Sequence, residues 1–145
     1  MSDKPEYVAP FISRVRVRDF RSIAECDVIL GPLTVIVGPN AAGKSNFLDA
    51  IRFVVDSLAE SPSQAISRRG GLPALLRRTP RADGDAVGTS FMVELTLAVS
   101  AKGSRSQPSA ATYLLEIDAR PGRNGDIVVG REELLLKVGK RSRSR

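Results

Sequence analysis

A glycine-rich segment of eight residues, Gly38–Ser45, constrains the fold of this chain more than any other feature. It reads Gly-Pro-Asn-Ala-Ala-Gly-Lys-Ser and matches the phosphate-loop pattern G-x-x-x-x-G-K-[ST] without a mismatch. The pattern has this meaning only in a loop between a buried strand and a helix. The sequence on both sides agrees with that context, and the segment therefore predicts a strand–loop–helix unit.

The neighbouring segments supply the strand and the helix. Leu33–Val37 is a nearly continuous apolar and β-branched run, which predicts a strand apolar on both faces inside a sheet. From Lys44 the apolar residues recur with the period of 3.6 of an amphipathic helix of about four turns. These residues are Phe47, Leu48, Ile51, Val54, Val55 and Leu58.

Each residue type in the motif has a distinct chemical use. Gly38 and Gly43 permit backbone conformations that let successive N–H groups converge on phosphate oxygens, and the helix N-terminus favours negative charge there. Lys44 supplies a positive charge for the β- and γ-phosphates, and the Ser45 hydroxyl can take one position on Mg²⁺. The candidate binding residues are Gly38, Pro39, Asn40, Ala41, Ala42, Gly43, Lys44, Ser45 and Asn46. The two asparagines have a second interpretation, as a turn former and a first-turn helix residue.

Other segments predict strands. Ile12–Phe20 alternates with period two, a turn follows at Asp19–Ser22, and Ala24–Leu30 is a second strand candidate. Alternation returns in three later stretches, and turn-rich residues at 101–108 and 121–126 separate them, which predicts an antiparallel meander. The three stretches are Phe91–Val99, Tyr113–Ile117 and Ile127–Val138. Residues 60–90 predict a mobile excursion with at most one short helix near Leu72–Leu76.

Composition and charge narrow the classes of function. The 145 residues suffice for one domain, 1–145. Cys26 is alone and histidine is absent, which excludes an internal disulfide, the usual zinc sites and histidine-based catalysis. Five of the six net positive charges come from the last nine residues, so a basic tail, 139–145, follows a nearly neutral body. That tail is interpreted as solvated, with binding to nucleic acid or another anionic surface as the alternative.

The sequence predicts a cytoplasmic chain without a membrane partner. Its longest apolar stretch, 28–37, is interrupted by Gly31, Pro32 and Thr34 and is shorter than the roughly 20 residues that span a bilayer. The first ten residues contain no apolar core of a secretory signal.

Several charged residues have two interpretations each. Arg21, in the first turn, is interpreted as a solvated arginine, with contact to a nucleotide as the alternative. The pairs at 68–69 and 77–78 are interpreted as solvated charge rather than as a nucleic-acid contact, because no aromatic residues are interleaved with them. Asp49 and Asp56, on the predicted helix, are expected to face solvent.

Three elements between Ile12 and Leu58 carry a family resemblance. They are Phe-Arg-Ser-Ile at 20–23, Gly-Pro-Asn at 38–40 and Gly-Lys-Ser-Asn at 43–46. Together they resemble the N-terminus of AAA-type ATPases in the SMC/RecF/OLD branch of the ABC ATPases. The resemblance implies an α/β fold, a P-loop ABC-ATPase-like lobe with a mixed sheet plus an antiparallel β-meander, as the N-terminal part of a longer ATPase. A degenerate or truncated gene product is the alternative origin.

The same resemblance implies the ligands and partners. ATP and Mg²⁺ would bind at Gly38–Ser45, two full-length protomers would sandwich ATP as a homodimer, and DNA, a nuclease or another effector would be the partner. The acid of a Walker B strand cannot be placed, since Glu116 interrupts Tyr113–Asp118 and Phe53–Asp56 has a helical period. A signature loop, a Q-loop glutamine and a switch histidine cannot be placed either. Catalytic residues therefore stay unknown, and we expect negligible ATP turnover by this chain alone.

Two other functions compete with the ATP-binding module. One is a non-enzymatic basic protein that binds nucleic acid and carries a vestigial phosphate loop; its DNA binding would depend strongly on salt and would be insensitive to Lys44→Ala. The other is a small P-loop kinase, which needs an acceptor site and a lid that the unpatterned residues 60–85 do not supply convincingly.

Overall fold

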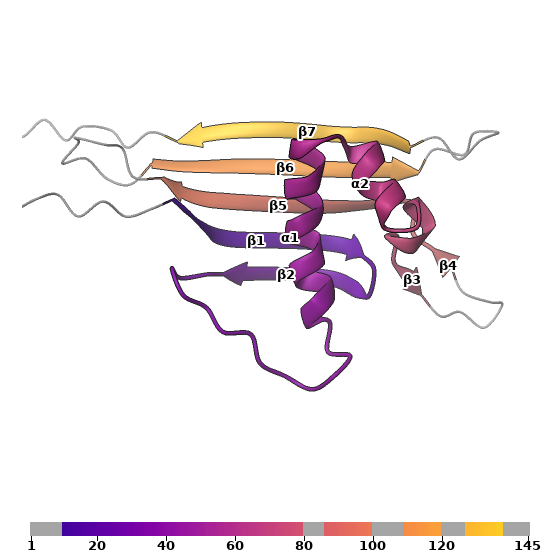
Figure 1. Cartoon of the computed structure of the whole chain (residues 1–145), viewed down its shortest axis with the longest axis horizontal. Coiled ribbons are helices and arrows are strands. Elements are labelled where there is room, and N and C mark those ends of the chain that lie inside the picture. The colour runs from indigo at the N-terminus through magenta and orange to yellow at the C-terminus, as the bar shows by residue number, and fades with distance from the viewer. Residues whose placement is uncertain (1–9, 80–85, 100–108, 120–126, 138–145) are drawn as a thin grey trace, which may run out of the picture.

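The computed structural model describes residues 10–79, 86–99, 109–119 and 127–137, and its main element is a five-stranded sheet (Figure 1). The strands are β1 (Phe11–Phe20), β2 (Ile23–Ile29), β5 (Ser90–Val99), β6 (Ser109–Ala119) and β7 (Ile127–Lys137). Their order is β2-β1-β5-β6-β7, and every neighbouring pair is antiparallel. The predicted first hairpin and the later meander are confirmed; the predicted turns at 101–108 and 121–126 lie outside the described residues.

Alternation along β1 explains the two faces of the sheet. Val15 and Val17 are buried on one face. The arginines of β1 alternate with these valines and lie on the other face, where Arg14 pairs with Asp27 of β2 at 2.6 Å. Arg16 contacts both Asp27 and Glu94 of β5, each at 3.5 Å. Since these charges are paired across neighbouring strands, the polar face needs no covering layer.

Helix α1 (Lys44–Ala59) crosses the strands and covers part of the apolar face (Figure 1). The predicted helix is confirmed, and its start at Lys44 agrees with the period change in the sequence. Its buried side consists of Phe47, Ala50, Phe53, Val54 and Ser57. Phe53 packs between Phe20 of β1 and Phe91 of β5, with ring centroids 6.1 and 5.3 Å away. This aromatic cluster fixes where α1 lies on the sheet.

Residues 62–79 are more regular than the sequence predicted. They form α2 (Pro62–Arg68), the 3₁₀ turn η1 (Leu72–Ala74) and β3 (Arg78–Thr79), which pairs with β4 (Ala86–Val87). The Ser61 hydroxyl caps α2 by accepting from the Gln64 N–H at 3.2 Å. Several apolar residues of the segment enter the core: Ala65, Ile66, Leu72, Leu75 and Leu76. The prediction of at most one short helix is therefore wrong, because scattered apolar residues find their burial in tertiary contacts.

Residues 33–37 do not form the predicted strand, and this prediction is wrong. The segment runs beyond the β2 edge before the chain returns to α1 (Figure 1). Leu33, Val35 and Val37 are 87%, 75% and 84% exposed. Described strands pair only as an antiparallel sheet and a short β3–β4 ladder, so no strand is available beside this segment. The α/β class is confirmed, but the mixed sheet is not seen among the described strands.

None of the helices in the described ranges has the length and hydrophobicity needed to cross a membrane.

Candidate functional site

The loop at residues 38–43 enters α1 through a left-handed glycine. Gly43 is the N-cap of α1 with φ 88°, a conformation that glycine adopts without steric cost. A glycine cap has no side-chain acceptor, and α1 has no acidic residue in its first turn. The N–H groups of the first turn therefore point out of the helix without a side-chain cap, and the positive end of the helix dipole lies beside them.

Lys44 folds back over this loop. Its Nζ donates to the carbonyl oxygens of Gly38 at 2.7 Å and of Pro39 at 2.6 Å. These bonds hold the ammonium group above the loop and use two of its three hydrogens. The third hydrogen and the positive charge remain for an anion that approaches the helix N-terminus.

A cavity of about 400 Å³ lies at this helix start. It is lined by Ser22, Asn40, Ala41, Ala42, Gly43, Lys44, Ser45 and Asn46. The structure thus brings seven of the nine predicted residues to one cavity, while the other two, Gly38 and Pro39, contact the Lys44 side chain. Asn46 lies in the first turn of α1, and its Nδ2 donates to the Ser22 Oγ at 2.6 Å. Its contact with a phosphate site stays a prediction.

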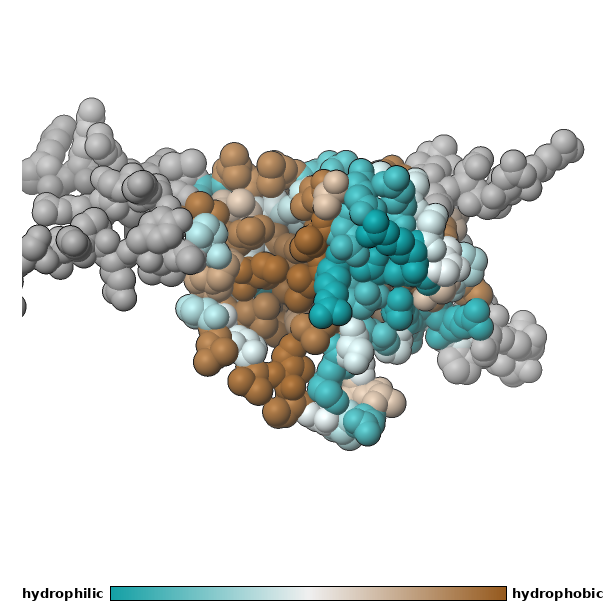
Figure 2. Space-filling model, in the orientation of Figure 1, coloured by the Kyte–Doolittle hydropathy of each residue, from teal (hydrophilic) through white to brown (hydrophobic). Residues whose placement is uncertain are grey.

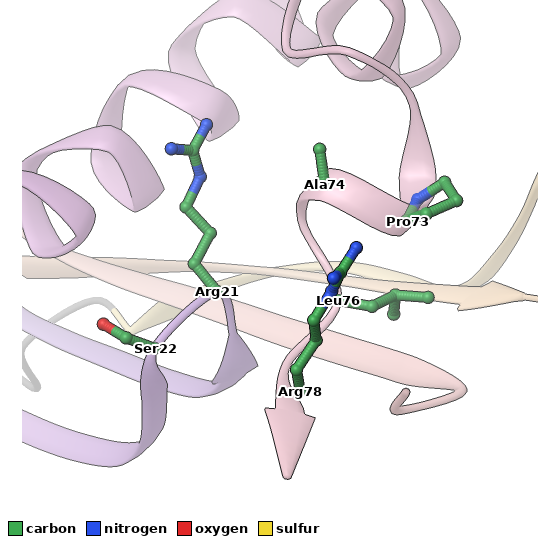
Figure 3. Close-up of a pocket in the computed structure, with 6 residues that line it drawn as sticks. All are labelled: Arg21, Ser22, Pro73, Ala74, Leu76 and Arg78. Carbon is green, nitrogen blue, oxygen red and sulfur yellow. The ribbon is translucent and has the colours of Figure 1, made fainter. Parts of the chain in front are cut away.

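Ser22 also lines this cavity, although the sequence did not indicate it as a candidate binding residue. It follows Arg21 in the β1–β2 turn, and it also borders a second cavity of about 390 Å³. That cavity is lined by Arg21, Ser22, Pro73, Ala74, Leu76 and Arg78 (Figure 3). The Phe-Arg-Ser-Ile element at 20–23 is part of the family resemblance. The fold places its Ser22 beside the glycine-rich loop, which the sequence alone does not indicate.

A cluster of opposite charges joins this turn to two helices. Asp49 of α1 lies 3.0 Å from Arg21 and 3.1 Å from Arg69, and Arg69 also reaches Asp56 at 2.7 Å. The Arg69 side chain is only 10% exposed and lies over the Phe53 ring. The prediction that Asp49 and Asp56 face solvent is correct only in part, because both carboxylates are partly exposed and ion-paired with Arg69. The solvated interpretation of Arg69 is wrong, because α2 brings this arginine back onto α1.

The neighbouring arginines differ from Arg69. Arg68 is 59% exposed and pairs with Glu60, which fits its interpretation as surface charge. Arg21 is partly exposed and turns toward α1 rather than toward Arg78 (Figure 3). Arg21 is ion-paired with Asp49 rather than fully solvated. Its alternative use, contact with a nucleotide, stays a prediction.

Cys26 lies in β2, near the end of the glycine-rich loop. It borders a cavity of about 240 Å³ together with Val37, Gly43, Lys44 and other residues. Burial raises the pKa of the Cys26 thiol, so the neutral form is favoured. Its half-buried side chain packs against the hydrophobic core.

The two acidic segments considered for a Walker B strand have the structures that the sequence predicts. Tyr113, Leu115 and Ile117 are buried in β6 while Glu116 alternates with them, and Asp56 belongs to α1. Within the described ranges, no group of three or more histidine, cysteine, aspartate or glutamate residues forms a metal site. The Ser45 hydroxyl, exposed in the first turn of α1, suits an ion that keeps its other ligands from water and phosphate.

An apolar surface extends from α1 across the uncovered part of the sheet (Figure 2). Its large exposed residues are Leu33, Val35, Val37, Leu48, Val55, Leu58, Leu134 and Leu136. Leu134 is paired with the buried Tyr113, so it lies on the same face of the sheet as α1. We call these eight residues the apolar surface. Patches of this kind mark places where other polypeptide packs.

Comparisons with known proteins agree with this geometry. Residues 33–98 match a family model described as "AAA domain, putative AbiEii toxin, Type IV TA system". The chain is 32% identical over 111 residues to the DNA replication and repair protein RecF of Gloeobacter violaceus, covering 72% of this chain and 30% of RecF. It is 50% identical over 44 residues to the OLD nuclease of Thermus scotoductus, covering 30% of this chain and 8% of the nuclease. The chain thus spans less than a third of the length of these relatives.

A solved structure shares the fold. It comes from work on ATP-driven dimerization and DNA-stimulated activation of SMC ATPases. The TM-score is 0.58 with 21% identity, over 87% of this chain and 69% of that chain. The relatives and the fold support the class predicted from the motifs, a fragment of an SMC/RecF/OLD-type ABC ATPase. Within that class, the chain corresponds to a P-loop ATPase module.

Proposed function

We propose that residues 38–46 bind the triphosphate of ATP together with Mg²⁺. The observation that carries the proposal is the position of the Lys44 ammonium, which two loop carbonyls hold beside the uncapped start of α1. The free N–H groups of the first turn would take phosphate oxygens, and Lys44 would take the β- and γ-phosphates. Ser45 would donate one oxygen to Mg²⁺.

The test is calorimetric titration of the chain with Mg²⁺-ATP. Lys44→Ala is expected to weaken binding by about 100-fold, since Lys44 is the one charged side chain among the described residues that line the loop cavity. Arg52→Ala, an exposed arginine on the same helix, is the matched control and should bind as the unmodified chain does. Equal affinities of the Lys44→Ala variant and the unmodified chain would refute the assignment.

We further propose that this module functions as part of a larger ATPase lobe. The apolar surface supports this, because Leu33, Val35 and Val37 precede the loop in an exposed segment that none of the described strands pairs with. The relatives are more than three times longer than the stretch they share with this chain, so they contain polypeptide that could cover such a surface. That polypeptide would also have to supply the acid and the other groups that orient the attacking water.

A chimera tests this requirement. The chain is joined to the part of G. violaceus RecF that follows the matched stretch, and phosphate release is measured for the chimera and for the chain alone. We expect turnover only in the chimera, and we expect it to be lost when Leu33, Val35 and Val37 are changed to serine. Phosphate release by the chain alone, abolished by Lys44→Ala, would show that no further polypeptide is needed.

For the whole protein, we propose ATP-dependent homodimerisation coupled to a DNA or effector partner. The support is the solved neighbour, whose title describes ATP-driven dimerization and DNA-stimulated activation. The alternative, a basic nucleic-acid-binding protein with a vestigial loop, loses one support because Arg69 is paired with Asp49 and Asp56. Its other support, the basic tail, lies outside the described residues.

A further inference from the structure

We propose that Asp49 is a positioning residue for the phosphate loop, acting through a brace formed by Arg21, Ser22, Asn46 and Asp49. The brace joins the β1–β2 turn to the first two turns of α1. This inference rests on the proposed nucleotide site, because its purpose would be to orient the N–H groups and Lys44 at the start of that helix. Asp49 itself lies outside the set of residues that line the loop cavity.

Two adjacent residues of the turn reach two residues on one side of the helix. The Ser22 Oγ accepts from Asn46 Nδ2 at 2.6 Å, and an Arg21 Nη2 lies 3.0 Å from an Asp49 carboxylate oxygen. Asn46 and Asp49 are three positions apart, so they are neighbours on the helix surface. A pair of contacts separated by almost one turn resists rotation of the helix about its axis, which a single contact would allow.

The turn is also held from its other side. The Arg21 N–H donates to the Leu75 carbonyl at 2.7 Å, and the Arg77 N–H donates to the Asp19 carbonyl at 3.1 Å. Asp19 and Arg21 have φ angles of 52° and 51°, which non-glycine residues seldom adopt. Between them the Phe20 ring is fully buried. The turn is thus a fixed support, and α1 is the element whose position depends on the brace.

Asp49 links the brace to α2. One carboxylate oxygen accepts from Arg69 Nε at 3.1 Å, while the other faces Arg21 without hydrogen-bond geometry. The attraction to Arg21 is therefore ionic, so an amide at position 49 would lose it while keeping the size of the side chain. Asp56 is the natural control, because it pairs with the same Arg69 two turns further from the loop.

The experiment compares Asp49→Asn with Asp56→Asn. Both variants lose one carboxylate partner of Arg69, but only Asp49→Asn also loses the pairing with Arg21. We expect Asp49→Asn to weaken Mg²⁺-ATP binding by about tenfold, and Asp56→Asn to change it by less than about twofold. Asp49→Glu restores the charge and should recover most of the affinity. Unfolding midpoints measured for all three variants identify the temperatures at which each is folded.

A second measurement needs no nucleotide. Hydrogen exchange of the amides at 47–50 should be faster in Asp49→Asn than in Asp56→Asn, because only the former loosens the start of α1. Equal exchange and equal affinity in the two variants would overturn the proposal. If the unmodified chain fails to bind Mg²⁺-ATP, the proposed function falls, while the exchange comparison still supports or rejects the brace.

Discussion

Strand β5 and residues 33–37 have nearly the same apolar character, but the side chains of β5 are buried alternately and those of residues 33–37 are largely exposed. In β5, Phe91, Val93 and Leu95 alternate into the core, and the backbone pairs with β1 on one side and β6 on the other. Residues 33–37 carry a similar series of apolar side chains, yet these side chains are largely exposed. The difference lies in the neighbours and not in the local sequence.

The comparison separates what a segment needs from what its surroundings provide. An apolar, β-branched run indicates that burial of its side chains would be favourable. Burial also requires a neighbouring strand to pair with and another element packed over the face of the strand. For β5 this chain provides both. For residues 33–37, which lead directly into the glycine-rich loop, the described strands provide neither. The proposed phosphate site therefore adjoins a largely exposed segment.

The largest expected effect is on the free energy of unfolding when one leucine of each segment is replaced by alanine. Leu95 is 4% exposed and Leu33 is 87% exposed. Leu95→Ala should lower the free energy of unfolding by about 2–4 kcal/mol, because it leaves a cavity in the core. Leu33→Ala should change it by about 0.5 kcal/mol or less. Urea denaturation of both variants measures this; a cost at Leu33 similar to that at Leu95 would mean that residues 33–37 are buried in solution.

A smaller effect is expected when a largely buried arginine and an exposed arginine at adjacent positions are compared in the same way. Arg69→Ala removes a largely buried guanidinium and leaves Asp49 and Asp56 without this partner, so we expect a loss of about 2 kcal/mol. Arg68→Ala, at the next position, removes a surface pair and should cost about 0.5 kcal/mol or less. Thermal unfolding of the two variants decides the matter, and equal losses would contradict the buried position of Arg69.

The smallest effect concerns Tyr113, on the face that α1 only partly covers. Its hydroxyl donates to Glu132 at 2.7 Å, and burial together with this carboxylate raises the pKa of Tyr113 above the ordinary value of 10.0. Tyr113→Phe should cost about 1 kcal/mol or less near neutral pH.

The direction of the pH dependence follows from the raised pKa. Because the folded state favours the neutral phenol, its contribution is present below pH 10 and is lost as the pH rises above the unfolded value. The stability difference between the unmodified chain and Tyr113→Phe should therefore shrink above pH 10. A difference that grows with pH in that range would contradict the burial of this hydroxyl.

Much of the fold could be predicted because its signals are local. The alternation in β1, β5 and β6 and the period change at Lys44 each depend on side chains within one element. The glycine-rich loop is equally local, since Gly43 is needed for a conformation at its own position. Residues 62–79 could not be predicted in this way, because their apolar residues show no clear period and are buried by contacts with distant elements.

The features of the candidate site likewise fall into those set by local sequence and those set by contacts between distant elements. The sequence by itself determined the loop, the start of α1 and the chemical types that its residues offer, because a left-handed glycine, a helix N-terminus and a lysine act within a few residues of one another. Only the tertiary structure decided that Ser22 borders the loop, that Asp49 pairs with Arg21 and Arg69, and that residues 33–37 stay exposed. These outcomes depend on which distant strands and helices meet, and a local pattern does not specify its partners.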